Sequence, residues 1–177
     1  MHMQRKVKLF IAPSLDCYIA RSDGSVDWLF TDGDYGYAKF YDSIDTVIMG
    51  RETYETVLKL EEHPYKDKKC YVFTRNPGEK YRNVEFVSDV VGVTESLVRS
   101  TEGKDIWLEG GGEINSILLD AGLIHEIIVS VHPIILGSGI PMFNNGIKQA
   151  DMKLVDLVRY DNGLVQMHYQ LLDALLI

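Results

Sequence analysis

The sequence predicts a three-layer α/β/α protein with a mixed, mostly parallel sheet that ends in an antiparallel C-terminal hairpin. Short apolar runs alternate along the chain with longer segments of helical spacing, which is typical of strand–helix–strand crossovers in a parallel sheet. Near the C-terminus, Asp161-Asn162-Gly163 separates two alternating runs, and Asn-Gly in such a position is a strong signal for a hairpin. In such folds, ligands bind at the carboxyl ends of the strands.

The first elements follow from apolar runs and their interruptions. Residues 7–13 (VKLFIAP) predict a buried strand, whereas residues 14–32 are rich in Asp, Gly and Ser and predict a long loop. Residues 34–43 carry aromatic side chains at helical spacing and predict a helix. A short buried strand is expected at 46–49, followed at once by a helix over 50–59.

The middle of the chain repeats the alternation. Residues 69–74 (KCYVFT) and 84–87 predict strands, and the helical spacing of 90–99 predicts a helix. Residues 105–109 (DIWLE) predict a strand, and 113–121 (EINSILLDA) predict a helix that stops at glycine.

The last elements complete the sheet. A long strand is expected within residues 124–135. Residues 153–160 and 164–172 flank the Asn-Gly turn and are expected to form the antiparallel hairpin.

Length and charge exclude several classes of protein. The 177 residues fit a single domain, 1–177, and the excess of 26 acidic over 18 basic residues argues against a nucleic-acid partner. No apolar run is long enough for a membrane span or a secretion signal, and two cysteines, Cys17 and Cys70, make no disulfide framework. We therefore expect a cytoplasmic protein with no membrane or nucleic-acid partner.

The first candidate ligand site is the junction after residues 46–49. Gly50 allows close approach of a ligand to the backbone, and the free N–H groups of a helix start attract phosphate. Arg51 is able to grip a phosphate bidentately and Thr53 to donate to another oxygen. A solvated helix start with a capping Thr53 explains the same residues.

A second junction contains three consecutive glycines. Gly110, Gly111 and Gly112 separate a strand from a helix, which suits either a pyrophosphate-binding turn or a plain tight turn. The spacing is neither that of the Rossmann fingerprint nor that of a P-loop.

A third junction follows residues 69–74. Thr74 and Arg75 place a hydroxyl and a cation directly after a strand end, where they are able to recognise the 2′-phosphate that distinguishes NADP from NAD. An ordinary polar turn is the alternative.

Taken in order, these motifs resemble the dihydrofolate reductase superfamily over most of the chain. The resemblance is closer to the reductase domain of riboflavin biosynthesis and its free-standing bacterial relatives. It is carried by Ser14-Leu15-Asp16 with Ile19-Ala20, by 47–53, by Thr74-Arg75, by Glu109-Gly110-Gly111, and by Pro133-Ile134-Ile135-Leu136-Gly137-Ser138-Gly139.

The resemblance implies an NADPH-binding reductase with a dihydrofolate-reductase-like fold. Gly50, Arg51 and Thr53 are then expected to hold the cofactor phosphates, and Thr74 and Arg75 to face the 2′-phosphate. Further residues expected beside the cofactor are Gly110 and Gly111 as a strained or cis peptide, Gly112, Glu113 and Ile114 at the helix start, and Ala12 and Ile19 at the nicotinamide. The family usually has glycine where this chain has Cys17; a positive φ there would strain the cysteine.

Hydride transfer needs a proton source, and three carboxylates are candidates. They are Asp16 in the loop after the first strand, Glu109 at the strand end before the glycines, and Asp34. Asp34 lies 50 − 34 = 16 residues before Gly50, about the spacing of the acidic residue in classical dihydrofolate reductases. A helix cap explains Asp34 equally well, and a solvated strand end explains Glu109.

For the substrate, the sequence offers Ser14 and the aromatic residues Trp28 and Tyr37, since flat heterocycles stack on rings. Core packing explains the two aromatic residues equally well. The five histidines show no metal-binding spacing, so no metal is expected.

The leading hypothesis is an NADPH-dependent reductase of a small heterocyclic or ribosylamino-pyrimidine substrate, similar to 5-amino-6-(5-phosphoribosylamino)uracil reductase. A pteridine or dihydrofolate reductase and a non-catalytic NADP-binding module remain as alternatives. Similar proteins are often homodimers, and the apolar end, residues 171–177, is a candidate for the interface. The zinc deaminase motifs that accompany the bifunctional riboflavin enzymes are missing from the sequence.

Overall fold

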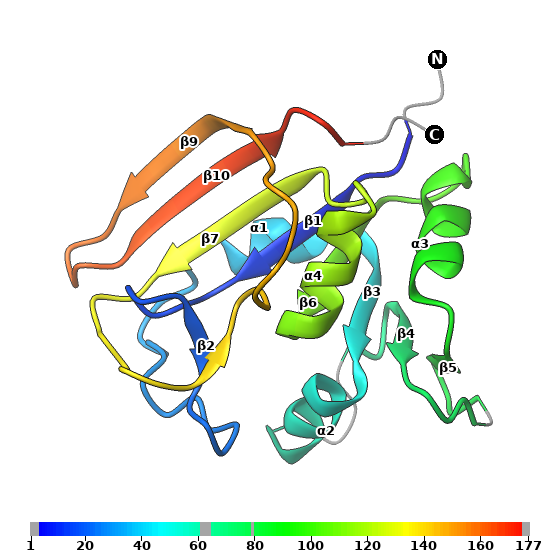
Figure 1. Cartoon of the computed structure of the whole chain (residues 1–177), viewed down its shortest axis with the longest axis horizontal. Helices are drawn as coiled ribbons and strands as arrows, with labels where there is room; N and C mark the ends of the chain where they lie inside the picture. The colour runs from blue at the N-terminus through cyan, green and yellow to red at the C-terminus, as the bar shows by residue number, and fades with distance from the viewer. Residues whose placement is uncertain (1–3, 61–64, 79, 175–177) are drawn as a thin grey trace.

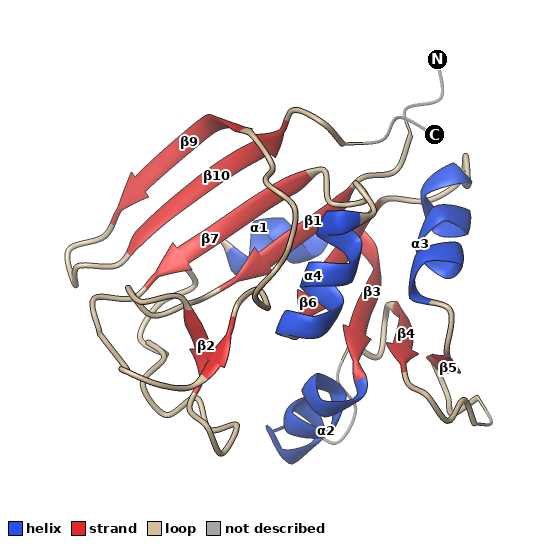
Figure 2. Cartoon of the chain, in the orientation of Figure 1, coloured by secondary structure: helices blue, strands red, loops and turns tan. Residues whose placement is uncertain are grey.

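A computed structural model describes residues 4–60, 65–78 and 80–174. Four helices alternate with the strands of a large sheet (Figures 1 and 2). The strands are β1 (Val7–Ile11), β2 (Tyr18–Ala20), β3 (Ile44–Gly50), β4 (Lys69–Phe73), β5 (Val84–Val87), β6 (Asp105–Gly110), β7 (Glu126–Val131), β8 (Ile140–Pro141), β9 (Met152–Arg159) and β10 (Val165–Leu171). The helices are α1 (Tyr37–Asp42), α2 (Arg51–Leu60), α3 (Val90–Arg99) and α4 (Gly112–Asp120).

The main sheet has eight strands in the order β5-β4-β3-β6-β1-β7-β10-β9. Strands β5 through β7 in this order are parallel, and β10 is antiparallel to both of its neighbours. This confirms the predicted mixed sheet with an antiparallel C-terminal hairpin. Because the strands from β5 to β7 are parallel, their carboxyl ends lie along one edge of the sheet.

The helices cover the two faces of the sheet in pairs, which confirms the predicted three layers. Side chains of α3 and α4, such as Val98 and Leu118, share one apolar core with Leu9 and Leu108 of the central strands. On the opposite face, Phe40 of α1 and Tyr54 of α2 pack with other sheet residues in a second core. In Figure 1, α3 and α4 lie in front of the sheet and α1 lies behind it.

The segment predicted as one long loop, residues 14–32, contains the short strand β2. It pairs antiparallel with β8, which comes more than a hundred residues later in the chain. A three-residue strand whose partner is so distant gives little local signal, so composition alone missed it. This β2–β8 ribbon lies beside the carboxyl edge of the main sheet (Figure 1).

The first helix begins later than predicted, at Tyr37 and not at Asp34. Tyr35 and Gly36 both have positive φ, which breaks the helical backbone just before α1. Asp34 Oδ1 accepts a hydrogen bond from the backbone N–H of Ala38, so the carboxylate pairs with a free N–H group in the first turn of the helix.

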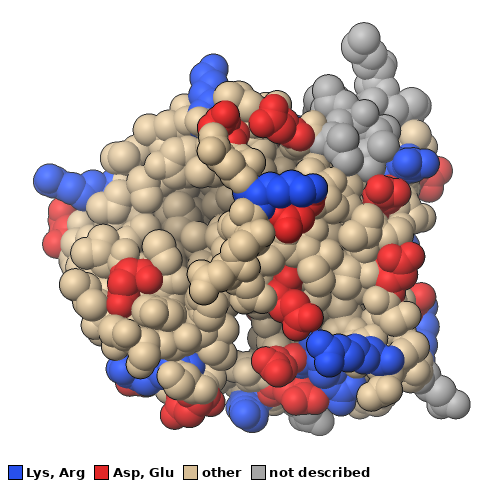
Figure 3. Space-filling view, in the orientation of Figure 1, with Lys and Arg blue, Asp and Glu red and all other residues tan. Residues whose placement is uncertain are grey.

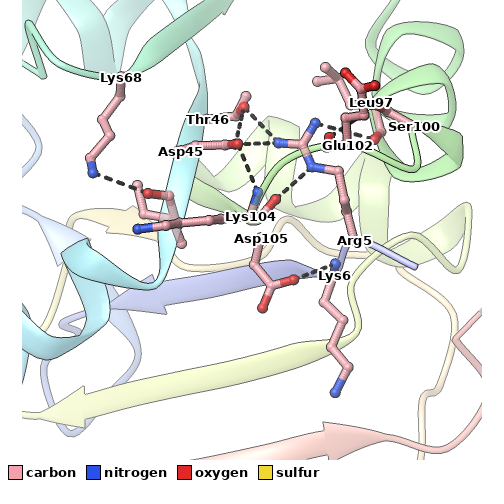
Figure 4. Close-up of polar contacts among 11 residues, drawn as sticks. Arg5, Lys6, Asp45, Thr46, Lys68, Leu97, Ser100, Glu102, Lys104 and Asp105 are labelled. Carbon is pink, nitrogen blue, oxygen red and sulfur yellow. Dashed lines mark hydrogen bonds and ion pairs between the residues drawn. The ribbon is translucent and has the colours of Figure 1, made fainter. Parts of the chain in front are cut away.

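The opposite edge of the sheet, where β1, β3 and β6 begin, is held by a polar network around Arg5 (Figure 4). The guanidinium is almost completely buried and donates to the Asp45 carboxylate, to Thr46 Oγ1 at 2.8 Å and to the carbonyl oxygen of Lys104 at 2.6 Å. The other oxygen of Asp45 accepts from the Lys104 backbone N–H at 2.8 Å. This network ties three strands together far from their carboxyl ends.

Candidate active site

A cavity of about 1020 Å³ opens at the carboxyl edge of the sheet. Its walls are α2 and the start of α4 on one side and the β2–β8 ribbon on the other, with β1 and β6 beneath. Figure 3 shows the molecule hollowed between these two parts. Its volume is at the upper end of the usual range for ligand pockets, and apolar surface predominates in its lining.

All three strand-to-helix and strand-to-turn junctions singled out in the sequence converge on this cavity. The candidate cofactor residues that line it are Ala12, Ile19, Gly50, Arg51, Thr53, Thr74, Arg75, Gly111, Gly112, Glu113 and Ile114. Gly110 is buried and is not part of the lining. Residues from four regions of the sequence thus meet because parallel strands place their carboxyl ends at one edge.

The N-terminus of α2 presents Arg51 and Thr53 to the cavity. The Arg51 side chain is about half exposed, its Nε donates to Glu55 Oε1 at 2.7 Å, and its guanidinium lies 5.2 Å from the centre of the Phe86 ring. These contacts leave N–H groups of the guanidinium fork for an anion in the cavity. Together with the free N–H groups of the helix start, they form a phosphate-binding arrangement.

The N-terminus of α4 approaches the same space. The Gly110–Gly111 peptide is cis, and Gly111 is the N-cap residue of α4. A β-carbon on Gly112 would collide with the carbonyl oxygen of Pro141, so this glycine lets the segment after β8 close against the helix start. In this way Asn144 also reaches the cavity.

Thr74 and Arg75 follow β4 at the far end of the cavity. The Arg75 side chain is 93% exposed, and its Nη2 lies 3.7 Å from Glu113 Oε1, which itself belongs to α4. Such an exposed pair contributes little to stability, so the guanidinium is free to exchange Glu113 for a ligand phosphate.

Glu109 is the one carboxylate of the three proton-donor candidates that lines the cavity. Its Oε1 accepts a hydrogen bond of 2.6 Å from the Tyr65 hydroxyl, while Oε2 is buried without a partner among the described residues. Burial raises the pKa of Glu109 to about 7, and the Tyr65 hydrogen bond opposes this shift. A carboxyl group with such a pKa is able to hold and release a proton near neutrality.

Asp16 lies outside the cavity lining, and its hydrogen bonds join two loops of the chain. It accepts hydrogen bonds from Ser14 Oγ at 2.6 Å and from the backbone N–H groups of Leu136 and Gly137 at 3.0 and 2.8 Å. The Ser14 hydrogen bond, helped by the two backbone donors, lowers the pKa of Asp16. The carboxylate thus stays ionised and joins the loop after β1 to the loop before β8.

The remaining candidates also lie outside the lining. Asp34 is exposed at the start of α1, and Ser14 is fully buried, where its hydroxyl donates to Asp16 and accepts from the Tyr18 N–H. Trp28 is buried with its ring edge-on to His132, as the core-packing alternative requires. Tyr37 packs edge-to-face on Trp107, a residue that does line the cavity, so it supports the wall from behind.

Several lining residues were missed by sequence reasoning. Phe10 and Trp107 are in β1 and β6, Val57 and Leu60 in the second half of α2, and Asn144 follows β8. Tyr65 was missed as the partner of Glu109. The apolar residues have the sequence pattern of ordinary core positions. Nothing in the local sequence links Tyr65 to a residue 44 positions away.

The backbone at Cys17 has φ 65°, so the condition for strain stated from the comparison with glycine is met. Its N–H donates to the Ser14 carbonyl, and its own carbonyl accepts from Met142 N–H at 2.9 Å. A non-glycine residue in this region carries backbone strain. The turn is therefore held by its hydrogen bonds in spite of the cysteine.

Among the described residues, no group of three His, Cys, Asp or Glu side chains is arranged to hold a metal ion. Within the same ranges, none of the helices has the length and apolar character to span a bilayer.

Comparison with known proteins finds relatives that match over most of the chain. Residues 65–166 match the RibD C-terminal domain family. The chain is 40% identical to the uncharacterized protein YwjB of Bacillus subtilis (strain 168), with 94% of this chain and 98% of YwjB covered. It is 32% identical to the uncharacterized protein YyaP of the same organism, with 94% and 95% covered.

Solved structures share the fold of this chain. A protein from Shewanella sp. PV-4 assigned to riboflavin biosynthesis superposes with a TM-score of 0.82 at 26% identity, covering 96% of this chain and 99% of that one. The diaminohydroxyphosphoribosylaminopyrimidine deaminase/5-amino-6-(5-phosphoribosylamino)uracil reductase of Thermotoga maritima superposes with a TM-score of 0.69 at 17% identity. The match covers 95% of this chain and 57% of the Thermotoga protein.

Proposed function

Since the chain belongs to the RibD C-terminal domain family, we propose that it is an NADPH-dependent reductase that transfers a hydride to a small heterocyclic substrate. One observation carries this proposal: three junctions with phosphate-binding character and a protonatable carboxyl group meet in a single cavity. A cavity with a few convergent polar groups and a titratable residue of perturbed pKa is the usual form of an active site.

The residues of the cavity fit a dinucleotide with an extra ribose phosphate. We assign the pyrophosphate to the N-termini of α2 and α4, with Arg51 and Thr53 as side-chain ligands. Thr74 and Arg75 lie at the third junction and are assigned to the 2′-phosphate. Gly50 and Gly111 keep the backbone close to the cofactor, and Ala12 and Ile19 flank its nicotinamide.

When bound, NADPH supplies the hydride, and this chain's residues supply position and a proton. The Glu109 carboxyl group is assigned as the proton donor because it lines the cavity and is half protonated near pH 7. Tyr65 fixes its orientation through the hydrogen bond to Oε1. Phe10 and Trp107 line the cavity with rings that exclude water, which strengthens electrostatic interactions near the reacting atoms.

The two alternatives make different predictions for this site. A non-catalytic NADP-binding module needs the phosphate-binding junctions but no proton donor. Glu109 Oε2, which is buried without a hydrogen-bond partner among the described residues, therefore favours an enzyme. A pteridine reductase and a ribosylamino-pyrimidine reductase both need the donor and differ in the substrate that the cavity accepts.

Thermal unfolding with NADPH and with NADH tests the cofactor assignment. A ligand at 100 times its Kd adds about 2.7 kcal/mol to the free energy of unfolding. We expect a clear rise of Tm with NADPH and a smaller one with equal NADH; the absence of any rise with NADPH contradicts the proposed function. A rise without NADPH oxidation over pterin, pyrimidine and flavin substrates supports the non-catalytic module.

We further propose that residues 1–177 act as one domain in a cytoplasmic homodimer. Both cysteines are free thiols, as a reducing compartment favours. The interface suggested by the apolar C-terminal end is not supported at Leu171, which is buried in the chain's own core; Leu172 is exposed, and residues 175–177 lie outside the described ranges.

The edge strand β9 offers a better surface for a second copy. Among the described strands it pairs with β10 alone. Apolar side chains are exposed along it at Met152, Leu154, Val155, Leu157 and Val158. A shift of register opposite His168 and Tyr169 puts Lys153 and Asp156 on one face of the strand. Antiparallel pairing of two β9 strands then sets each Lys153 opposite Asp156 of the partner subunit, so the strand complements itself.

A further inference from the structure

The part of the cavity around Glu109 is aromatic and aliphatic. Tyr65 contacts two residues of β6: its ring centroid lies 5.2 Å from that of Trp107, and its hydroxyl donates to Glu109 Oε1. The Phe10 ring lies edge-on to Trp107, with centroids 6.3 Å apart. Val57 and Leu60 add aliphatic side chains to the cavity lining from the second half of α2.

The described cations of the cavity lining follow β3 and β4, where the cofactor phosphates are assigned, and the Arg51 guanidinium lies over Phe86 of β5, three strands from β6 in the sheet order. Among the described lining residues the cations are Arg51 and Arg75, and each is paired with a glutamate, Glu55 and Glu113 respectively. The few residues outside the described ranges include no Lys or Arg. The other charged lining residues, Glu52 and Glu109, are acidic.

Resting on the proposed function, we infer that the substrate is a flat, uncharged heterocycle with a carbon–nitrogen double bond and no phosphate group. Aromatic rings suit a flat substrate, which stacks on or packs against them. A phosphate beside Glu109 would bring two or nearly two negative charges into an apolar wall that holds no cation, a costly arrangement. In this respect the chain differs from the reductase whose substrate carries a phosphoribosyl group.

The reduction of such a substrate beside Glu109 balances with NADPH as the hydride source and Glu109 as the proton donor. The substrate carbon of C=N gains the hydride supplied by NADPH, which leaves as NADP⁺, and the π electron pair moves to nitrogen. The nitrogen takes the proton of the Glu109 carboxyl group, and the Glu109 carboxylate recovers a proton from water. No other oxidant or reductant is required.

A matched pair of compounds tests this inference by binding as well as by turnover. The probes are 5-amino-6-(ribosylamino)uracil and its 5′-phosphate, which differ only in the phosphate, with a 7,8-dihydropterin as a third unphosphorylated compound. Calorimetry on the protein saturated with NADP⁺ is expected to show at least about tenfold weaker binding of the phosphate compound. NADPH oxidation is expected to follow the same order in kcat/KM.

Equal or tighter binding of the phosphorylated compound overturns the inference, and so does a lack of binding by every unphosphorylated probe. Neither result touches the proposed function, because NADPH binding is measured separately by its effect on Tm. A failure of NADPH to bind contradicts the proposed function itself.

A charge placed inside the cavity provides a second, independent test. Thr56 lines the cavity from α2, whereas Leu58 on the same helix is exposed outside it. Thr56→Lys is expected to tighten binding of the 5′-phosphate by about tenfold and to leave the unphosphorylated partner little changed, while Leu58→Lys changes neither. If both variants change the affinity for the 5′-phosphate equally, or if Thr56→Lys does not raise it, the inference that the part of the cavity around Glu109 holds no cation is contradicted.

Discussion

Tyr65 donates a hydrogen bond of 2.6 Å to Glu109 Oε1, while Glu109 Oε2 is buried without a partner among the residues that the structure describes. One oxygen of the carboxyl group is thus fixed, and the other is left to carry a proton. Burial and the nearby Glu109 raise the pKa of Tyr65, so its hydroxyl remains a donor while Glu109 titrates.

Removing this hydroxyl is expected to move the pH profile of the reaction. The hydrogen bond stabilises the ionised form of Glu109, so Tyr65→Phe raises the Glu109 pKa above about 7. A proton donor is active below its pKa, and therefore the loss of kcat/KM at rising pH shifts upward, by about one pH unit. The Cys70 thiol, with a pKa raised to about 12 mainly by burial, stays neutral over this range.

Tyr41→Phe is the matched control, because the Tyr41 hydroxyl donates to Asp67 and not to Glu109. Its pH profile is expected to match that of the unaltered protein. An equal shift of the pH profile in both variants would show that the shift does not come from the Tyr65 hydrogen bond to Glu109.

Glu109→Gln is expected to lower kcat by at least about a hundredfold while NADPH still raises Tm. The same variant tests the pKa through stability. The folded-state pKa of Glu109 is raised, so the folded protein keeps a proton that the unfolded chain releases, and stability falls as pH rises from about 5 to about 7.

Urea unfolding from about pH 5 to about pH 8 measures this loss of stability, which amounts to at most about 3 kcal/mol at pH 8. Glu109→Gln should lack this component of the pH dependence. If the variant keeps the full dependence, Glu109 is not the group responsible.

Arg51→Ala is expected to weaken NADPH binding by about 10- to 100-fold, since charge-assisted hydrogen bonds to phosphate are worth about 1.5–3 kcal/mol. Arg99→Ala is a suitable control: it breaks a similar helical pair, with Glu95, in α3 away from the cavity. Comparable losses of affinity, measured by fluorescence titration of NADPH, would point to overall charge and not to a contact at Arg51.

The network around Arg5 is expected to govern stability and not binding. Arg5→Met leaves Asp45 and Thr46 without their buried donor and should reduce the free energy of unfolding by about 3 kcal/mol. Arg21→Met removes an exposed pair with Asp27 and should have little effect. Urea unfolding compares the two, and an unchanged NADPH Kd in Arg5→Met confirms that the network is separate from the site.

The proposed dimer is tested by mass in solution. Light scattering should give twice the chain mass of 20.1 kDa for the unaltered protein and the chain mass for Leu157→Asp, because a charge on β9 opposes pairing of two edges. Ile135→Asp places the same charge on an exposed loop residue and should leave the dimer intact. A monomeric unaltered protein would contradict the proposed interface.

Sequence patterns predicted the elements whose information is local. The hairpin around Asn162-Gly163 is confirmed because its signal is local: the strands join through Asp161, Asn162 and Gly163, and Gly163 takes the positive φ of 92°. The junctions at Gly50, Thr74 and Gly111 were found for a similar reason, since strand, glycine and helix start are adjacent in the chain. Their convergence followed from a rule about parallel sheets, and the cavity bears it out.

The choice among Asp16, Asp34 and Glu109 depends on tertiary structure. In sequence all three are carboxylates near predicted strand or helix ends, and burial and hydrogen-bond partners decide their proton affinity. The Ser14 hydroxyl, helped by two backbone N–H groups from residues about 120 positions away, keeps Asp16 ionised, whereas burial beside Tyr65 keeps a proton on Glu109 near pH 7. The sequence by itself determined where the chain turns and where glycines permit close approach; only the folded structure determined the local dielectric environment, because that depends on residues far apart in the chain.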